Sequence, residues 1–157
     1  MSNKLLELLE PSAVCLHLMA EDSEGVITKL GGLLEQAGYV KDTFVAAALA
    51  REKELPTGLP LDGDINAAIP HTDVEHVKRS GVAMATLEKP VVFQNMVNKD
   101  ESVLVRLVFL LSLEQPKAQI EMLQVIAGVL QNAEVVSSLI DAKNFEDVRQ
   151  SLALFEV

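Results

Sequence analysis

The segment that runs from Ala68 to Asp73 contains the side chain best suited to covalent chemistry. It reads Ala-Ile-Pro-His-Thr-Asp, and His71 follows an apolar stretch that ends at Pro70. A proline ends regular strand pairing and fixes its own φ, so the chain that leads to His71 should be rigid. Because α/β folds present reactive groups just beyond strand ends, we expect His71 at the rim of a sheet.

A histidine in such a place can carry a phosphoryl group. Its neutral imidazole is a nucleophile at neutral pH, since its ordinary pKa is about 6.5, and it can form a covalent intermediate. The other ring nitrogen must then be held as N–H by an acceptor, for which Asp73 and a backbone carbonyl are both candidates. The phosphoryl oxygens need a cation, and the guanidinium of Arg51 could fork onto them. The alternative for Arg51 is an exposed helical residue paired with a nearby Glu.

Other kinds of site receive less support from the sequence. His71, Asp73 and His76 include metal-ligand types, but zinc needs three or four ligands in fixed geometry, and no C-x-x-C or H-x-H spacing occurs. The glycine patterns that cradle nucleotide phosphates, and the G-x-S-x-G pattern of serine hydrolases, are also absent. We therefore expect no metal and no cofactor, and a structural role for His17, which falls within a strand pattern.

The composition is that of one globular domain that spans residues 1–157. The chain is 49% hydrophobic and 23% charged, which is ordinary for a folded domain of this length. With 13 Lys and Arg against 23 Asp and Glu, the net charge is −10. This charge excludes nucleic-acid binding through a general basic surface and leaves room for a partner protein with a basic face.

The sequence predicts a cytoplasmic protein that does not insert into a membrane. Its single cysteine, Cys15, excludes an internal disulfide, fits a reducing compartment, and is expected in the core. The longest apolar run, residues 107–113, is far shorter than the roughly 18 residues of a membrane span. Charged residues interrupt the N-terminal segment, which therefore does not resemble a secretory signal.

The periodicity predicts an α/β domain, a three-layer sandwich in which helices flank a mixed sheet. The nearly continuous apolar run at 103–113 is typical of a strand covered on both faces. We expect strands at residues 12–19, 65–69, 82–87 and 103–113, and helices at 22–37, 42–53, 116–130, 133–140 and 144–154, the first capped by Asp22 or Ser23 and ended by Gly38.

Two blocks together resemble a known family. Residues 51–59 read R-E-K-E-L-P-T-G-L, and residues 68–73 read A-I-P-H-T-D. The pair resembles the enzyme IIA domains of the bacterial sugar phosphotransferase system, in the fructose–mannitol–nitrogen superfamily and its galactitol-type branch. The likeness extends over about residues 5–150, through further segments at 77–78, 89–91, 93, 96, 105–109 and 118–124.

The resemblance implies a mixed sheet flanked by helices and a relay of phosphoryl groups. In the family, the histidine after Ile-Pro accepts the group on Nε2 from the phosphocarrier protein HPr and passes it to a cysteine of a cognate enzyme IIB, the partner of the membrane component IIC. This places the acceptor role on His71 and puts Arg51 near the phosphorylated site. Cys15 does not match the IIB cysteine.

One departure concerns the mannitol-type members, which carry a second histidine in an N-x-x-H-I segment. Residues 116–120 here read P-K-A-Q-I, so Gln119 falls at that position. Glutamine can hydrogen-bond a phosphate but cannot carry a proton charge. The departure argues against a mannitol transporter and does not identify the sugar, whose specificity normally lies in IIC.

Two alternatives remain beside a transport role. The first is a regulatory binding module like the nitrogen-type relatives, in which the phosphorylated histidine changes partner choice through its added charge. The second is an α/β domain without activity, which a fully buried His71 would support. The galactitol-like segments favour sugar uptake over regulation.

Overall fold

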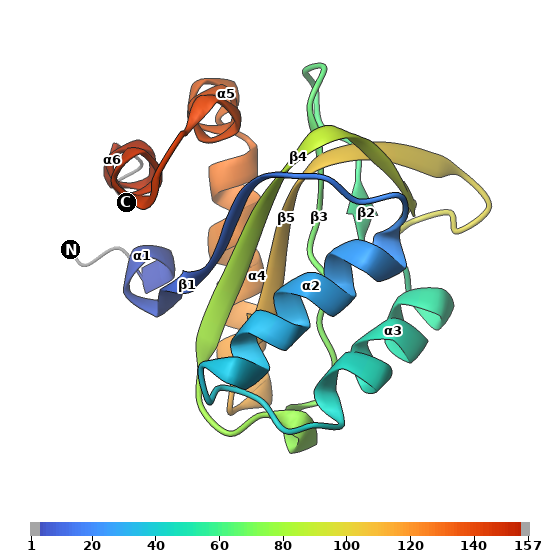
Figure 1. Ribbon diagram of the computed structural model, residues 1–157. Coiled ribbons are helices and arrows are strands. Elements are labelled where there is room, and N and C mark those ends of the chain that lie inside the picture. Colours follow the sequence, from blue (N-terminus) through green and yellow to red (C-terminus); the bar gives the residue numbers. More distant parts are fainter. Residues whose placement is uncertain (1–3, 155–157) are drawn as a thin grey trace.

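The computed structural model describes residues 4–154, which form a mixed five-stranded sheet between two layers of helices (Figure 1). This confirms the predicted three-layer α/β sandwich. The strands are β1 (Leu9–Leu18), β2 (Gly58–Leu59), β3 (Asn66–Ala68), β4 (Gly81–Gln94) and β5 (Ser102–Ser112). The helices are α1 (Lys4–Leu8), α2 (Ser23–Gln36), α3 (Phe44–Glu54), α4 (Pro116–Leu130), α5 (Ala133–Asp141) and α6 (Phe145–Ala153), with a 3-10 turn η1 (Val74–His76).

The strands lie in the order β1-β4-β5-β3-β2. β4 and β5 form an antiparallel pair at the centre; β1 runs parallel to β4, and β3 runs parallel to β5. β5 is covered on both faces, as its apolar run predicts: Leu107 and Phe109 pack into one hydrophobic cluster, while Val108 and Leu110 pack into the other. This places β3, and the chain that leaves it, beside the most buried strand.

Each hydrophobic cluster lies under its own helices. α2 and α3 cover one face of the sheet, while α1, α4, α5 and α6 pack against the other (Figure 1). α2 begins as predicted, because the Asp22 side chain accepts a hydrogen bond from the Gly25 N–H at 2.8 Å. It ends before Gly38, whose φ of +88° suits a residue without a Cβ.

The structure also differs from the predicted elements. β4 continues past residue 87 to Gln94, across a pairing irregularity between Thr86 and Val91 that contains Pro90. A bulge of this kind is where a proline can enter a strand. The short elements α1, β2 and η1 were not predicted, since each has five residues or fewer. Cys15 is half-buried at the edge of a cluster and not fully in the core.

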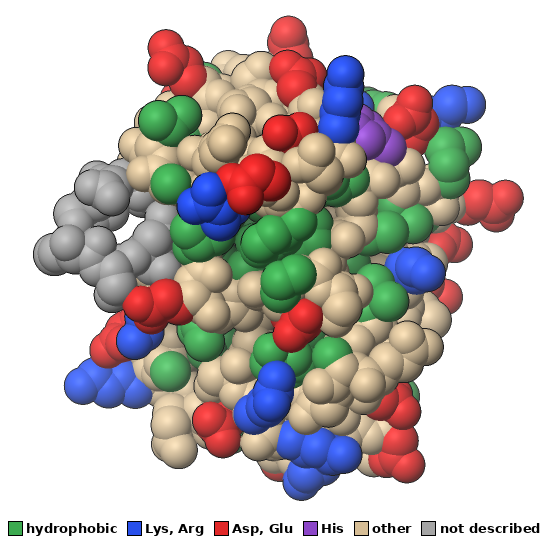
Figure 2. Space-filling view, turned by 60° about the vertical axis from the view of Figure 1, so that its left-hand side comes forward, with side chains coloured by type: hydrophobic (Ala, Val, Ile, Leu, Met, Phe, Trp, Pro, Cys, Tyr) green, Lys and Arg blue, Asp and Glu red, His purple; other side chains and the backbone are tan. Residues whose placement is uncertain are grey.

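Within residues 4–154, no single helix is long and apolar enough to cross a membrane, and α4 with α5 reaches that length and composition only across a 90° bend. On the face shown in Figure 2, acidic and basic side chains are interspersed around a central hydrophobic area. That face therefore presents charges of both signs and not a single basic patch.

Candidate active site

His71 lies just beyond β3, held by backbone contacts on its N-terminal side. The carbonyl of Pro70 accepts a hydrogen bond from the Leu111 N–H on β5 at 3.2 Å. His71 Nδ1 lies 2.8 Å from the carbonyl oxygen of Ile69. Because a carbonyl can only accept, Nδ1 carries the proton, and in the neutral ring Nε2 therefore carries the lone pair.

The imidazole is half-buried and is not sealed inside the molecule. Among residues 4–154, the buried side-chain nitrogen and oxygen atoms that lack a hydrogen-bond partner are Arg51 Nε and Gln119 Oε1. Nε2 of His71 also lacks a partner within that part of the chain but is not among these buried atoms, so it reaches solvent. The lone pair is therefore accessible to an incoming group.

The surroundings of His71 favour its neutral form. Burial lowers the pKa of His71 below its ordinary value of 6.5; the hydrogen bond to Ile69 opposes this shift, the charge of Arg51 adds to it, and the charge of Asp73 opposes it. The net pKa is lowered. At neutral pH the ring is therefore largely unprotonated, which is the nucleophilic state.

Arg51 lies in the last turn of α3 and is turned toward the His71 segment. Its Nη1 donates a hydrogen bond to Oδ1 of Asp73 at 3.0 Å, which also forms an ion pair. Nε is buried and has no hydrogen-bond partner among the described residues. The alternative of an exposed helical arginine paired with a nearby Glu is therefore wrong, and Asp73 holds Arg51 and not the His71 ring.

Glu52 is a site-proximal residue to which the sequence patterns assign no role. Its Oε2 accepts the Thr57 N–H at 2.9 Å, and its Oε1 accepts the Thr57 hydroxyl at 2.8 Å. Burial raises the pKa of Glu52 to about 7, against the lowering effect of these two hydrogen bonds. The sequence signal that could have predicted this contact is the block R-E-x-x-x-x-T, which contains both Glu52 and Thr57.

A groove of about 440 Å³ adjoins the segment that follows His71. Asp73, Val74 and Glu75 line one side, and the start of α4 lines the other with Pro116, Gln119 and Ile120. Gln119 Oε1 is buried there without a hydrogen-bond partner among the described residues, and Ile120 is 59% exposed. The structure thus brings Gln119 to the same groove as Asp73, the partner of Arg51.

The remaining histidines have structural contacts. His17 Nε2 lies 2.9 Å from the Ala142 carbonyl, which ties the end of β1 to the chain after α5. His76 Nδ1 lies 2.8 Å from the Thr43 hydroxyl. No group of three or more His, Cys, Asp or Glu side chains within residues 4–154 is arranged to hold a metal ion.

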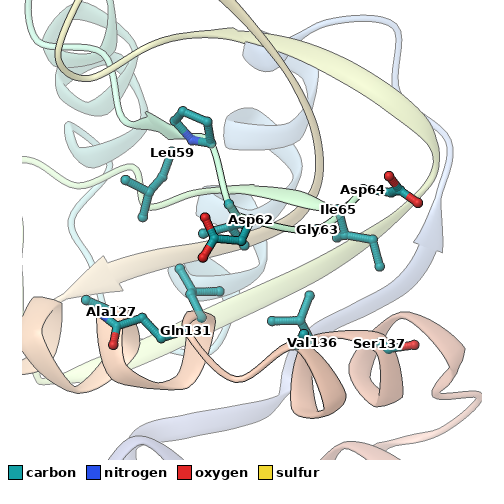
Figure 3. A pocket seen from close by; sticks show the side chains of 13 residues that line it. Leu59, Asp62, Gly63, Asp64, Ile65, Ala127, Gln131, Val136 and Ser137 are labelled. Atoms are coloured by element: carbon teal, nitrogen blue, oxygen red, sulfur yellow. The ribbon is translucent and has the colours of Figure 1, made fainter.

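A second cavity, of about 490 Å³, lies between the loop that joins β2 to β3 and the junction of α4 with α5 (Figure 3). Asp62, Gly63 and Asp64 belong to the loop, while Gln131 and Ser137 belong to the helical side. This cavity shares no lining residue with the groove beside α4, so the two are separate, and neither His71 nor Arg51 lines it.

Comparison with known proteins identifies the family. Residues 7–154 match the family described as "Phosphoenolpyruvate-dependent sugar phosphotransferase system, EIIA 2". The chain belongs to this family. The resemblance carried by residues 51–59 and 68–73 is thereby confirmed, and with it a phosphocarrier role in a sugar phosphotransferase system.

Individual relatives in the EIIA 2 family agree in sequence and in fold. The galactitol-specific EIIA component of Escherichia coli K12 is 36% identical over 119 residues, which are 76% of this chain and 78% of that protein. Enzyme IIA-mannitol of E. coli, solved in complex with phosphorylated enzyme IIB-mannitol, superposes with a TM-score of 0.77 at 26% identity and covers 94% of this chain and 98% of its own. The nitrogen regulatory protein IIA-Ntr of Neisseria meningitidis has a TM-score of 0.75 at 27% identity, with 95% and 99% covered.

Proposed function

We propose that residues 1–157 act as one enzyme IIA domain that accepts a phosphoryl group from HPr on Nε2 of His71. The domain then passes this group to a cysteine of a cognate enzyme IIB during uptake of galactitol or a related sugar. The observation that carries the proposal is the hydrogen bond from Nδ1–H of His71 to the Ile69 carbonyl, because it leaves the lone pair on the solvent-facing Nε2.

Each transfer is a displacement at phosphorus. In the first, the Nε2 lone pair of His71 forms an N–P bond while the bond between phosphorus and the donor breaks, and the donor keeps the electron pair. In the second, the IIB thiolate forms an S–P bond while the N–P bond breaks and its electron pair returns to Nε2. No proton leaves Nδ1 in either step, so the Ile69 carbonyl can hold the ring throughout.

Arg51 supplies the positive charge that such a transfer needs. Its guanidinium carries N–H donors that can fork onto phosphoryl oxygens, and its ion pair with Asp73 keeps the long side chain in place. The acidic net charge of −10 favours encounter with partners that present a basic face, chiefly through the association rate.

The relatives support the partner and the sugar class. A relative solved with phosphorylated enzyme IIB shows that this fold docks such a partner in the mannitol system. The galactitol-specific relative, 36% identical to this chain, favours galactitol or a related polyol over mannitol. The proposed relay takes place in the cytoplasm and requires no metal and no cofactor.

Incubation with phosphoenolpyruvate, enzyme I and HPr tests the proposal. We expect the intact protein to gain the mass of one phosphoryl group, and we expect acid to remove it, because a phosphohistidine N–P bond is acid-labile. His71→Gln should abolish the gain. His76→Gln is the matched control, because His76 bonds to Thr43 and should leave phosphorylation unchanged. An active donor that fails to phosphorylate the native protein would refute the relay.

A regulatory role is the second candidate, favoured by the similarity to the nitrogen regulatory protein IIA-Ntr. Added phosphate charge beside the groove at Asp73 and Glu75 would repel an acidic partner surface. Pull-down with the phosphorylated and unphosphorylated protein distinguishes the two roles. A transport component should capture enzyme IIB, whereas a regulator should capture a different protein in one phosphorylation state only.

A further inference from the structure

A continuous path of hydrogen bonds leads from the end of α3 to the His71 ring. The Glu52 carboxylate holds both the N–H and the hydroxyl of Thr57. The Thr57 carbonyl in turn accepts the Ile69 N–H at 3.4 Å. The Ile69 carbonyl accepts Nδ1–H of His71 at 2.8 Å. A displacement of Thr57 is therefore transmitted through Ile69 to the carbonyl that selects the tautomer of the ring.

We propose that Glu52 is a positioning residue for phosphoryl transfer: by fixing Thr57 beside β3, it places the Ile69 carbonyl so that Nε2 of His71 keeps its lone pair. The inference rests on the proposed function, since it explains how the acceptor nitrogen of that reaction is prepared. Glu52 touches neither the ring nor the phosphoryl group in this account. It acts through Thr57 and Ile69.

The segment that follows Thr57 has little room to move. Gly58 pairs with Ala68 in the β2–β3 ladder, and its carbonyl accepts the Met96 N–H at 2.8 Å. A Cβ at Gly58 would lie 2.5 Å from the carbonyl oxygen of Gln94, so the backbones already touch there. Because Gly58 is closely packed against Gln94, the backbone that follows Thr57 cannot shift, and the Glu52 carboxylate holds Thr57 beside this fixed segment.

The other flank of His71 is tied to the same helix. Arg51, the neighbour of Glu52 on α3, pairs with Asp73, two residues after the histidine. Ile69, reached from Glu52, lies two residues before it. Two consecutive residues of α3 therefore hold the two sides of one five-residue segment, which is what a preorganised nucleophile requires.

The role depends on hydrogen bonds and not on the charge of Glu52. A glutamine at this position has the same shape: its amide oxygen can accept the Thr57 N–H, and its NH2 group can donate to the Thr57 hydroxyl oxygen. An alanine can do neither. Glu52→Gln should therefore preserve the path, while Glu52→Ala should break it.

The experiment measures the ring itself as well as the reaction. Nitrogen-15 NMR of the unphosphorylated protein at about pH 8, above the ordinary imidazole pKa, reports the tautomer of His71. In Glu52→Ala we expect the excess of the Nδ1–H tautomer to fall by about fivefold, which corresponds to the loss of one net hydrogen bond, and we expect phosphorylation by HPr to slow by a similar factor. Glu52→Gln should restore both readouts. Glu54→Ala, at an exposed position on the same helix, is the matched control and should change neither.

Two results would overturn the proposal. The first is a folded Glu52→Ala protein with the native tautomer ratio and rate; the second is a folded Glu52→Gln protein as impaired as the alanine variant. If Glu52→Ala does not fold, Thr57→Val provides the test, because it removes only the hydrogen bond from the Thr57 hydroxyl to Glu52. This variant should lower the excess of the Nδ1–H tautomer severalfold, and an unchanged tautomer ratio would overturn the proposal. If HPr fails to phosphorylate the native protein, the proposed function is refuted, but the tautomer ratios of the variants still test whether Glu52 positions the His71 ring.

Discussion

Replacing Glu52 with glutamine should change how the stability of the protein depends on pH. Burial raises the pKa of Glu52 from 4.5 to about 7 in the folded protein. Above about pH 4.5 the carboxyl of the unfolded chain loses its proton while the folded protein still holds it. The folded state then binds more protons, so the free energy of unfolding falls as the pH rises and levels off above about pH 7.

The size of the effect follows from the shift. Each pKa unit is worth about 1.36 kcal/mol, so a shift of about 2.5 units lowers stability by about 3 kcal/mol in all. Most of this loss, about 2.5 kcal/mol, falls between about pH 5 and about pH 8 when the two titrations are integrated. Glutamine does not titrate, keeps both contacts to Thr57, and should lack this slope.

Urea unfolding of both proteins over this pH range provides the assay. The chain contains no tryptophan, so far-ultraviolet circular dichroism is the suitable signal. All other titrating groups are common to the two proteins and cancel in the difference between their free energies of unfolding. The difference should shift in favour of Glu52→Gln by about 2.5 kcal/mol as the pH rises from about 5 to about 8.

A difference that stays constant over that range would refute the reasoning. It would mean that Glu52 is as well solvated in the folded protein as in the unfolded chain, so that burial does not raise its pKa. Glu54→Gln, at an exposed position on the same helix, is the control for removing a carboxylate from α3. Its pH profile should run parallel to that of the native protein.

Three further predictions concern single sites. Arg51→Ala should slow phosphorylation by about 10²–10³-fold in an HPr-coupled assay, and Arg51→Lys should recover only part of the rate because an ammonium lacks the guanidinium fork. Gly58→Ala should lower the free energy of unfolding by about 1–3 kcal/mol in urea titration, since its Cβ would lie 2.5 Å from the Gln94 carbonyl oxygen; an unchanged midpoint would contradict this. Asn132→Ala should cost about 1 kcal/mol in thermal unfolding, because Asn132 caps α5 by accepting from two backbone N–H groups, whereas Asn132→Asp should cost little.

Local signals in the sequence were sufficient for most of the elements and for the candidate nucleophile. The cap at Asp22, the positive-φ Gly38 and the apolar run of β5 act within a few residues, so the helix and strand positions follow from local chemistry. The failures were elements without a local signature. β2 has two residues and is defined by its pairing with β3, and the part of β4 beyond Pro90 pairs with β5.

Pro70 and the apolar residues before it predicted that His71 lies beyond a strand end. The block at residues 51–59 indicated Arg51 as the second residue of the candidate site. The partners of these side chains could not be read in the same way. Asp73 and a backbone carbonyl were equal candidates to hold Nδ1, and the structure assigns that contact to Ile69. Asp73 instead pairs with Arg51, from a helix 22 residues earlier in the chain.

Residue types and their order in the chain were enough to indicate the proposed chemistry: an imidazole that follows a proline, a guanidinium in the R-E-x-x-x-x-T block, and no glycine loop for a nucleotide. The folded arrangement was needed to assign the lone pair to one nitrogen of His71 and to connect Glu52 to that ring. The physical reason is that both depend on hydrogen bonds formed when α3 packs against the chain around β2 and β3. Such bonds are set by the distance and direction of groups that no local pattern brings together.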